Sequence, residues 1–518
     1  MNYGRRIRLG LLFLLLLLLS LLTSSKINFV TADLGRHIKN GEIILASQGE
    51  TLRGRDVLQK NLYSYSYPDF PFLNHHWGSG VIFYLVHKAF GFNGVSALFL
   101  IVSLTTFGLF FDIARRKSSF GTAFLVSILL LPLLVDRTEI RPEMFSYLLA
   151  GIFFWILSKK EKTKKWLMIL PLLLLFWVNL HVYFFLGLFL IGIFLLEAII
   201  KKNLKEAKLL GEVLLLSILA SFLNPAGIKG IFYPFLIFGN YGYRVLENQS
   251  VWFLDRIVRY PSSLYFKISF GLLLLGWIFV FWKARKISLS NLILTVFISY
   301  LGWTAVRNFT LFGFFALPII SSNLSEFDFA RRYLGREKFS DVSLYFLVSS
   351  LAVMIAFILF LINIPYWQTK SSFGFGLKDG AEKAAEFFKK EKLKGPVFNN
   401  YDNGGYLIYY LYPKERVFVD NRPEAYPKEF FDQVYIPMQE DNGRWEEMDL
   451  KYKFNTVFFY RHDLTPWAQT FLVNRIVDSS WAPIYVDDFS IIFVKRNEIN
   501  KELINKFELP KEMFTVTN

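Results

Sequence analysis

Long apolar runs recur through the first 365 residues, and they constrain the fold more than any other feature of the sequence. A helix needs roughly 17–25 residues to cross a bilayer, and several of these runs lie at the short end of that range. Charged residues make up only 19% of the chain, against roughly 25% in soluble proteins. The sequence therefore predicts a multi-pass α-helical membrane protein and excludes a purely soluble enzyme. We predict eleven membrane-spanning helices, at residues 8–27, 94–114, 119–135, 144–158, 166–182, 183–200, 208–223, 263–282, 288–304, 308–322 and 342–364.

The formal net charge of +16 is unevenly distributed along the chain. Residues 366–518 carry 21 Lys and Arg against 23 Asp and Glu, whereas the whole chain carries 58 and 42. The positive excess therefore lies among the apolar runs, which is typical of cytoplasmic loops and not of a surface that binds nucleic acid. Basic clusters occupy every second connection between the predicted spans: 5–8, 115–117, 159–165, 201–208, 283–286 and 331–338. The positive-inside rule then predicts a plasma (inner) membrane protein with its N-terminus in the cytoplasm and residues 366–518 outside.

Two apolar stretches near the N-terminus need a separate interpretation. The first run begins like a signal peptide, but no clean small-x-small cleavage site precedes Lys26, so we expect it to remain as a span. Residues 80–90 are apolar but too short to cross, and they predict an interfacial helix that leads into the second span. The chain contains no Cys, which excludes disulfides and thiolate metal sites.

Acids, histidines and amides gather in the connections that are predicted to lie outside. Polar groups at membrane depth are expensive, and they usually line a cavity or a pathway. We therefore expect an outward-facing polar cavity built from several loops, including the long first outer loop, 31–78. Its candidate residues are Asp33, His37, His75 and His76 in that loop, Arg141 and Glu143 after the third span, Asn179 and His181 at the end of the fifth, and Arg307 after the ninth.

Each candidate also has a structural alternative. Asp33 could cap the helix that follows it, whether or not it is catalytic. His75 and His76 could anchor the short helix, bind substrate hydroxyls or bind a metal. Arg141 and Glu143 could form an ion pair at a helix start, where Pro142 suits the first turn.

The remaining outer residues have similar alternatives. Asn179 and His181 could make hydrogen bonds between helices. Residues 224–227 (NPAG) predict the end of a span. Arg307 could bind an anion, or it could extend along the helix end toward the interface.

Short motifs in the outer connections follow a distinctive order. They are TADLGRHI at 31–38, NHHW at 74–77, FYLVHKAFG at 83–91, WVNLH at 177–181 and RNF at 307–309. This order resembles the C-type (GT-C) integral-membrane glycosyltransferases, among them protein O-mannosyltransferases, aminoarabinose transferases and bacterial lipopolysaccharide sugar transferases. The motifs are short and degenerate, and the resemblance extends to about residue 320.

The resemblance implies that Asp33 is the catalytic base. Leu34 stands where mannosyltransferase-like members carry a second acid, and the metal-binding Asp-x-Asp of oligosaccharyltransferase-like members is absent. We therefore expect a metal-independent mechanism with no cofactor, and keep a divalent metal as the alternative.

The predicted topology agrees with this chemistry. Nucleotide sugars are confined to the cytoplasm, so an outward-facing site must take its sugar from a lipid carrier such as a polyprenyl phosphate. Arg141, Arg256 and Arg307 could hold the phosphate as it leaves. A carboxylate would remove the proton of the acceptor hydroxyl in a single, inverting displacement. The acceptor could be a glycan, a lipid or a protein.

Residues 366–518 predict a separate soluble α/β domain behind the membrane domain, 1–365. Asp420 and Arg422 lie at a predicted strand end, where α/β sheets bind ligands, so they are candidates for acceptor recognition; turn residues alone are the alternative. The predicted elements are helices at 381–393 and 465–477, strands at 397–399, 416–420 and 455–460, a turn at 403–405, a short apolar element at 406–412, and a hairpin formed by 483–486 and 490–494.

A second function remains open at this point, namely a non-catalytic transporter or a polysaccharide-assembly protein with an outer docking domain. A transporter would place its polar groups near the middle of the bilayer, open to both sides. Here they gather at one face, which favours the enzyme.

Overall fold

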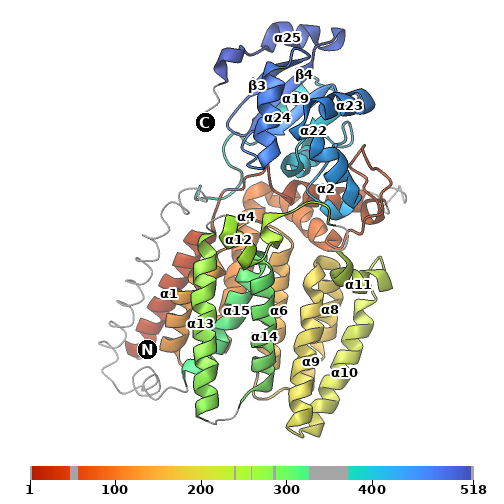
Figure 1. Cartoon of the computed structure of the whole chain (residues 1–518). Coiled ribbons are helices and arrows are strands. Elements are labelled where there is room, and N and C mark those ends of the chain that lie inside the picture. Colours follow the sequence, from red (N-terminus) through yellow and green to blue (C-terminus); the bar gives the residue numbers. More distant parts are fainter. Residues whose placement is uncertain are drawn as a thin grey trace.

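The computed structural model describes residues 3–46, 56–237, 241–257, 260–283, 287–325 and 372–514. Within these residues, apolar helices form a bundle beneath a smaller tail domain, residues 372–514 (Figure 1). The bundle helices are α1 (Tyr3–Thr23), α4 (Trp77–Lys117), α5 (Phe120–Leu134), α6 (Glu143–Leu157), α8 (Ile169–Leu180), α9 (Phe185–Ile200), α10 (Leu204–Ser221), α13 (Pro261–Trp282), α14 (Leu289–Thr304) and α15 (Phe309–Leu324).

Each of the first ten predicted spans overlaps one of these helices, and the predicted span 342–364 lies outside the described residues. Four helical segments of the described chain are long and apolar enough to cross a membrane by themselves: Gly4–Thr23, Trp77–Lys117, Val182–Ile200 and Pro261–Trp282. The helical membrane fold is therefore confirmed, whereas the number of eleven spans stays a prediction. Shorter helices and turns connect the bundle: α7 (Lys164–Leu167), η1 (Val182–Phe184), α11 (Ile228–Leu236), η3 (Leu246–Asn248), α12 (Val251–Ile257) and η4 (Val306–Asn308).

The helix predicted at 80–90 forms the first part of α4. Gly91 interrupts the helix with φ 63° and ψ −163°, a left-handed φ that favours glycine because it has no Cβ. The kink separates the short first segment from the longer apolar segment that follows. Near the N-terminus, α1 packs against the bundle through Leu15 and Leu19, which are buried.

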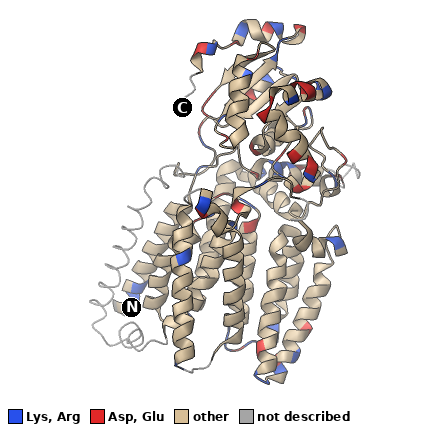
Figure 2. Cartoon of the chain, in the orientation of Figure 1, with Lys and Arg blue, Asp and Glu red and all other residues tan. Residues whose placement is uncertain are grey.

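The charged residues distinguish the two ends of the bundle. Basic residues, with a few acids, lie at the far ends of α9 and α10, which point away from the tail domain (Figure 2), and α4 ends in Arg115, Arg116 and Lys117. The first outer loop lies at the opposite end, against the tail. This separation matches the predicted sidedness, which stays a prediction because the structure contains no membrane.

We expect cysteine labelling to reveal this sidedness directly. The chain has no Cys, so Asp69→Cys in the first outer loop (85% exposed side chain) and Leu464→Cys in the tail (92% exposed) can be tested singly. Both should react with a membrane-impermeant maleimide on intact cells. Lys205→Cys at the exposed start of α10 should react only after permeabilisation. Labelling of only one of the first two positions would contradict the topology.

The tail domain contains a four-stranded sheet of order β1-β2-β4-β3. Strands β1 (Val397–Asn399) and β2 (Thr456–Tyr460) are parallel, whereas β4 (Ser490–Lys495) is antiparallel to both β2 and β3 (Trp481–Val486). The structure confirms the predicted strand 397–399, the third strand and the hairpin. The tail helices are α19 (Lys383–Lys390), α20 (Gly404–Leu411), α21 (Lys428–Phe430), α22 (Pro437–Glu440), α23 (Asn442–Tyr452), α24 (Pro466–Val477) and α25 (Lys501–Phe507).

Two predictions for the tail domain are wrong. Residues 416–420 do not form a strand of the sheet. Val417 makes only an isolated bridge, with Ser64 of the first outer loop. The predicted turn at 403–405 instead leads into α20, whose first residues are Gly404 and Gly405. The lack of side chains there allows a close approach, since a Cβ on Gly35 would lie 2.6 Å from the Gly405 carbonyl oxygen.

This close approach joins the first outer loop to the tail domain. The helix α2 (Leu34–Ala46) packs on α20, and Leu34, Ile38 and Tyr406 share one buried core. Side chains alternate across the sheet, so Phe458 belongs to this core while Phe459 packs on the opposite face. The loop and the tail therefore form one unit, which holds the start of α2 against the tail.

Candidate functional site

Guanidinium and carboxylate groups form a buried network where the bundle meets the tail domain. Arg137 donates from Nε to Glu143 Oε1 and from Nη1 to Glu247 Oε2, each at 2.6 Å. Arg307 donates from Nη1 to Asn248 Oδ1 at 2.9 Å, and its Nη2 lies 3.4 Å from Glu143 Oε2. The residues come from the start of α6, from η3 and from η4, so the network links three connections on the tail side of the bundle.

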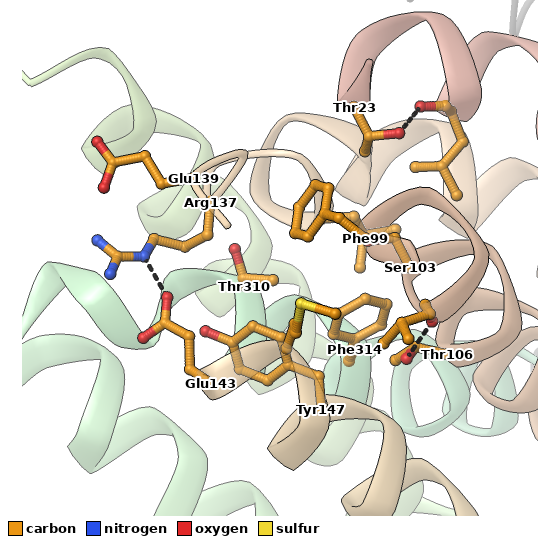
Figure 3. A pocket seen from close by; sticks show the side chains of 14 residues that line it. Thr23, Phe99, Ser103, Thr106, Arg137, Glu139, Glu143, Tyr147, Thr310 and Phe314 are labelled. Atoms are coloured by element: carbon orange, nitrogen blue, oxygen red, sulfur yellow. Dashed lines mark hydrogen bonds and ion pairs between the residues drawn. The ribbon is translucent and has the colours of Figure 1, made fainter. Parts of the chain in front are cut away.

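Packed side chains seal the network on its membrane side. Figure 3 shows Arg137 bonded to Glu143 at the polar end of a pocket, with Tyr147 pointing toward the pair and Phe314 behind it. The cavity there measures about 20 Å³, which is room for about one water molecule. The open side of the network therefore faces the tail domain.

Arg141 connects this network to Asp33. Its Nη1 donates to Glu247 Oε1 at 2.8 Å and lies 3.8 Å from Asp33 Oδ2, while Nη2 lies 2.6 Å from Glu139 Oε2. Glu247 thus contacts several guanidinium groups. Burial by itself would raise the pKa of Glu247, but the arginines around it hold that pKa well below its usual value.

Asp33 occupies the position directly before α2. Its main-chain carbonyl accepts a hydrogen bond from the His37 N–H at 3.2 Å, as expected for the residue before a helix. Burial raises the pKa of the Asp33 carboxyl, although Arg141 and then Arg36 oppose the shift. Helix entry and participation in a charged site are therefore compatible at this residue.

Histidine rings form a cluster beside Asp33. The ring centroids of His37 and His76 lie 5.4 Å apart, and His76 stacks on His181 at 5.1 Å. Burial holds the pKa of His37 and His76 well below the usual value, so both rings are neutral near pH 7 and can accept or donate hydrogen bonds. His181 also contacts Ser146 of α6 at 2.8 Å, which matches its structural alternative.

A small cavity of about 150 Å³ brings most of the predicted site residues together. From the membrane domain it is lined by Asp33, Arg36, His37, His76, Arg141, Glu143, His181, Glu247 and Arg307. From the tail domain it is lined by Tyr401, Asp402, Asn421 and Glu424. The cavity is therefore lined mainly by polar side chains and is shared between the two domains.

A larger cavity of about 510 Å³ adjoins the small one. Both are lined by Glu247, Tyr401 and Asp402, whereas Asp136, Arg244 and Lys378 line only the larger cavity. Asp33 lines the small cavity, and its neighbours Thr31 and Ala32 reach the larger one. The site thus has two compartments with Asp402 on their common wall.

Several nitrogen atoms of side chains that line the small cavity have no hydrogen-bond partner among the described residues. They are Arg36 Nε, His37 Nδ1, Arg141 Nε and Arg307 Nε, and each is buried. An unsatisfied buried polar group costs about 1–3 kcal/mol. A polar ligand or bound water would satisfy these atoms, and the small cavity is therefore the candidate binding site.

Three of the other candidate residues lie outside these cavities. His75 lines a separate pocket next to Asn224, and burial lowers its pKa to about 3. Asn179 accepts from Trp77 Nε1 at 2.9 Å and joins α8 to the start of α4. Arg256 is exposed at the end of α12 and lines neither cavity.

Asp420 and Arg422 form a buried pair instead of an open strand-end site. Arg422 Nε and Nη2 each donate to the Asp420 carboxylate at 2.6 Å, and Nη2 also donates to Asn61 Oδ1 of the first outer loop at 2.7 Å. Their exposed fractions are 0% and 2%. The pair therefore fastens the loop to the tail, and this placement does not favour direct acceptor contact.

Sequence reasoning missed Glu247, Asp402 and Glu424 as site residues. Glu247 stands in a connection without a recognisable motif, and only the three-dimensional structure brings it to the arginines. Asp402 lies in the NNYDNGGY stretch, residues 399–406, between the end of the predicted strand 397–399 and the predicted turn at 403–405. Within the described chain, no group of three or more His, Asp and Glu side chains is arranged to hold a metal ion.

We expect Glu247→Gln to destabilise the folded protein. The change leaves Arg137, Arg141 and Arg307 without their common anion, and loss of one partner of a buried pair costs about 3–5 kcal/mol. The Glu247 side chain is 19% exposed, so the lower end of that range applies. Thermal melting of the purified chain measures the loss, and Glu429→Gln at an exposed position of α21 is the control. Equal melting temperatures for both variants would contradict a central role for Glu247.

No protein-family model matches the sequence, and no curated protein matches it. Solved structures do. The oligosaccharyltransferase AglB of Archaeoglobus fulgidus, in complex with an inhibitory peptide and a dolichol-phosphate, has a TM-score of 0.59 at 12% identity, over 95% of this chain and 74% of that one. ArnT of Cupriavidus metallidurans bound to undecaprenyl phosphate has a TM-score of 0.53 at 11% identity, over 95% of this chain and 98% of that one. Both are GT-C glycosyltransferases.

The chain has the GT-C fold. The match to ArnT extends over nearly the full length of both chains, so the GT-C likeness includes the tail domain as well as the bundle. This result confirms the resemblance seen in the motifs. The Archaeoglobus fulgidus enzyme has also been solved in complex with Zn and sulfate, with a TM-score of 0.55 at 10% identity over 92% of this chain and 72% of that one.

Proposed function

We propose that the chain transfers a sugar from a polyprenyl-phosphate-linked donor to an acceptor at the outer face of the membrane. The observation that carries the proposal is the polar cavity in which Asp33 faces Arg141, next to Arg307, beneath the tail domain. The GT-C fold supports it, because the two fold neighbours are glycosyltransferases whose structures contain dolichol-phosphate or undecaprenyl phosphate.

The arginines bind the phosphate of the donor. Glu143 and Glu247 fix the orientation of the guanidinium groups, while Arg141 Nε and Arg307 Nε remain without a partner among the described residues. Guanidinium groups bind phosphate oxygens through strong charge-assisted hydrogen bonds. They also stabilise the negative charge that develops on the phosphate as it leaves.

Asp33 serves as the base in a single displacement. Its carboxylate takes the proton of the acceptor hydroxyl while the acceptor oxygen forms a bond to the anomeric carbon. The bond from that carbon to the phosphate oxygen breaks, and the phosphate leaves with the electron pair. Attack from the side opposite the phosphate inverts the anomeric configuration. His37, His76 and His181, all in the same cavity, provide hydrogen-bonding groups for sugar hydroxyls.

We propose that the reaction needs no divalent metal. Glu139, Glu143 and Glu247 are each paired with a guanidinium group at 2.6–2.8 Å, so the arginines already supply the positive charge that a metal would otherwise bring to the phosphate.

The tail domain is proposed to help bind the acceptor, because Tyr401 and Asn421 close the cavity from its side.

A transfer assay tests this function. The purified full chain in proteoliposomes is incubated with undecaprenyl-phosphate hexoses and a lipid extract of the source cells as acceptor. We expect the donor to be split into undecaprenyl phosphate and a new glycoside. A transporter would move the intact lipid-linked sugar between leaflets without breaking the bond to phosphate, and that result would favour the alternative function.

A further inference from the structure

Asp402 is a half-buried carboxyl that the tail domain presents to the catalytic cavity. It lies in η5 (Tyr401–Asn403), directly after β1 and before α20. The turn is held firmly, since Asn403 Nδ2 donates to the Phe458 carbonyl oxygen at 3.0 Å and Tyr401 stacks on Tyr243 at 4.2 Å. The position of Asp402 is therefore fixed by the sheet below it and by the membrane domain beside it.

The electrostatic surroundings of Asp402 differ from those of three glutamates near the cavities. Glu139, Glu143 and Glu247 each pair closely with an arginine. Among the described residues, Asp402 forms no ion pair with any basic side chain, although both cavities contain arginines. Burial raises the pKa of Asp402 to about 7, with further increases from nearby carboxylates and an opposing effect of Arg141.

The charges that act on Asp402 come from several elements. They are Asp463 after β2, Asp33 before α2, and Glu139 and Arg141 between α5 and α6. The larger cavity adds Arg244 and Lys378. Asp402 can therefore exist in both protonation states near neutral pH, which suits a group that receives and releases a proton.

The proposed reaction requires such a group. The donor phosphate is a diester with one negative charge, whereas the product is a monoester whose charge approaches −2 at pH 7. Each turnover therefore releases the proton of the acceptor hydroxyl. Asp33 takes that proton first and must lose it before the next turnover.

We propose that Asp402 accepts the proton from Asp33 across the small cavity and releases it through the larger cavity. The inference rests on the proposed function. Asp402 is suited to the task because it lines both cavities, while Asp33 and Glu424 line only the small one. Glu247 also lines both cavities, but it is paired with Arg137 and Arg141. The step breaks the O–H bond of protonated Asp33 and forms one on the Asp402 carboxylate, and Asp402 then gives the same proton to solvent, so the step balances without any other reactant. The tail domain thereby contributes to the reaction as well as to acceptor binding.

The variant Asp402→Asn in the full chain tests the proposal. It is given undecaprenyl-phosphate hexoses, and the release of undecaprenyl phosphate is measured. A positioned proton-transfer group contributes about 10²–10⁴-fold. Because Asp402 acts through Asp33, we expect kcat to fall by about tenfold in dilute buffer, with unchanged binding of undecaprenyl phosphate. Added imidazole, a diffusing proton acceptor, should restore the rate. Asp432→Asn, at an exposed position of the tail, should leave the rate unchanged.

A stability measurement tests the same group without substrate. Because the folded-state pKa of Asp402 is raised to about 7, its contribution to stability is complete below the usual Asp value and is lost as the pH rises through about 7. Melting temperatures should therefore fall more between pH 5 and pH 8 in the unchanged protein than in Asp402→Asn.

Two results would overturn the proposal. One is an Asp402→Asn variant with unchanged rate and pH profile, or with a loss that imidazole does not restore. The other is an identical pH dependence of melting in both proteins. If the unchanged protein releases no undecaprenyl phosphate at all, the proposed function fails, and the melting comparison still decides whether Asp402 titrates as inferred.

Discussion

Asp33→Asn is expected to abolish sugar transfer while the protein stays folded. Asparagine keeps the size of the side chain and suits the position before a helix, but it cannot take up the proton of the acceptor hydroxyl. Loss of a general base lowers the rate by about 10²–10⁴-fold. The measurement is kcat for the release of undecaprenyl phosphate, together with the affinity for that lipid, which should change little.

The pH profile gives a second criterion for Asp33. Burial raises the pKa of this carboxyl above the usual Asp value, and the base acts only when ionised. The rate of the unchanged protein should therefore decrease as the pH falls through that raised pKa. The matched control is Asp69→Asn, a highly exposed acid of the same outer loop. Near-normal turnover in Asp33→Asn would remove Asp33 from the mechanism.

Replacement of Arg141 or Arg307 by lysine is expected to weaken donor binding. Lysine keeps the charge but loses the planar group that can hold two phosphate oxygens. A hydrogen bond to a charged group is worth about 1.5–3 kcal/mol, which corresponds to about a ten- to hundredfold weaker Kd. Binding of undecaprenyl phosphate to the purified chain measures the change at each position.

Arg256→Lys is the matched control for these variants. Arg256, near the end of α12, was also a candidate for the donor phosphate, but it is exposed and lines neither cavity. Its replacement should therefore leave Kd unchanged. If neither Arg141→Lys nor Arg307→Lys weakens binding, the donor phosphate is held elsewhere. Melting temperatures of all three variants distinguish lost contacts from lost folding.

The bundle could be predicted closely because hydropathy is a local property. Every apolar run up to residue 322 overlaps a helix, and Gly91 marks the kink between the short and the long part of α4. Most of the tail domain could also be predicted from the sequence, because its strands are short apolar segments with turn residues between them. The GT-C resemblance rested on motifs that the structure brings to one cavity, including Asp33, His37 and Arg307.

The errors arose where distant contacts override the local pattern. Residues 416–420 alternate like a strand, but Phe418 and Val419 are both buried. Within the described part of the chain, the only bridge of this segment leads to Ser64 of the first outer loop. Gly404 and Gly405 predict a turn, because sequence alone cannot reveal that α2 packs closely against these two residues.

The charged site shows the same limit. Arg141, Glu143 and Arg307 could be selected by their place in outer connections, whereas Glu247, which binds several of the arginines, has no distinguishing sequence context. Asp420 and Arg422 were expected to bind a ligand, yet their pairing satisfies both side chains within the fold. Which polar residues pair with one another depends on tertiary contacts that neither spacing nor composition encodes.

The anomeric configuration of the product shows directly whether Asp33 drives a single displacement. The purified full chain is given an undecaprenyl-phosphate hexose of known configuration in proteoliposomes, with the lipid extract of the source cells as acceptor, and the new glycoside is examined by NMR. We expect that the donor is split, that undecaprenyl phosphate is released, and that the configuration at the anomeric carbon is inverted, with all three lost in Asp33→Asn. A product with retained configuration, or one formed equally well by Asp33→Asn, would contradict a single displacement driven by Asp33.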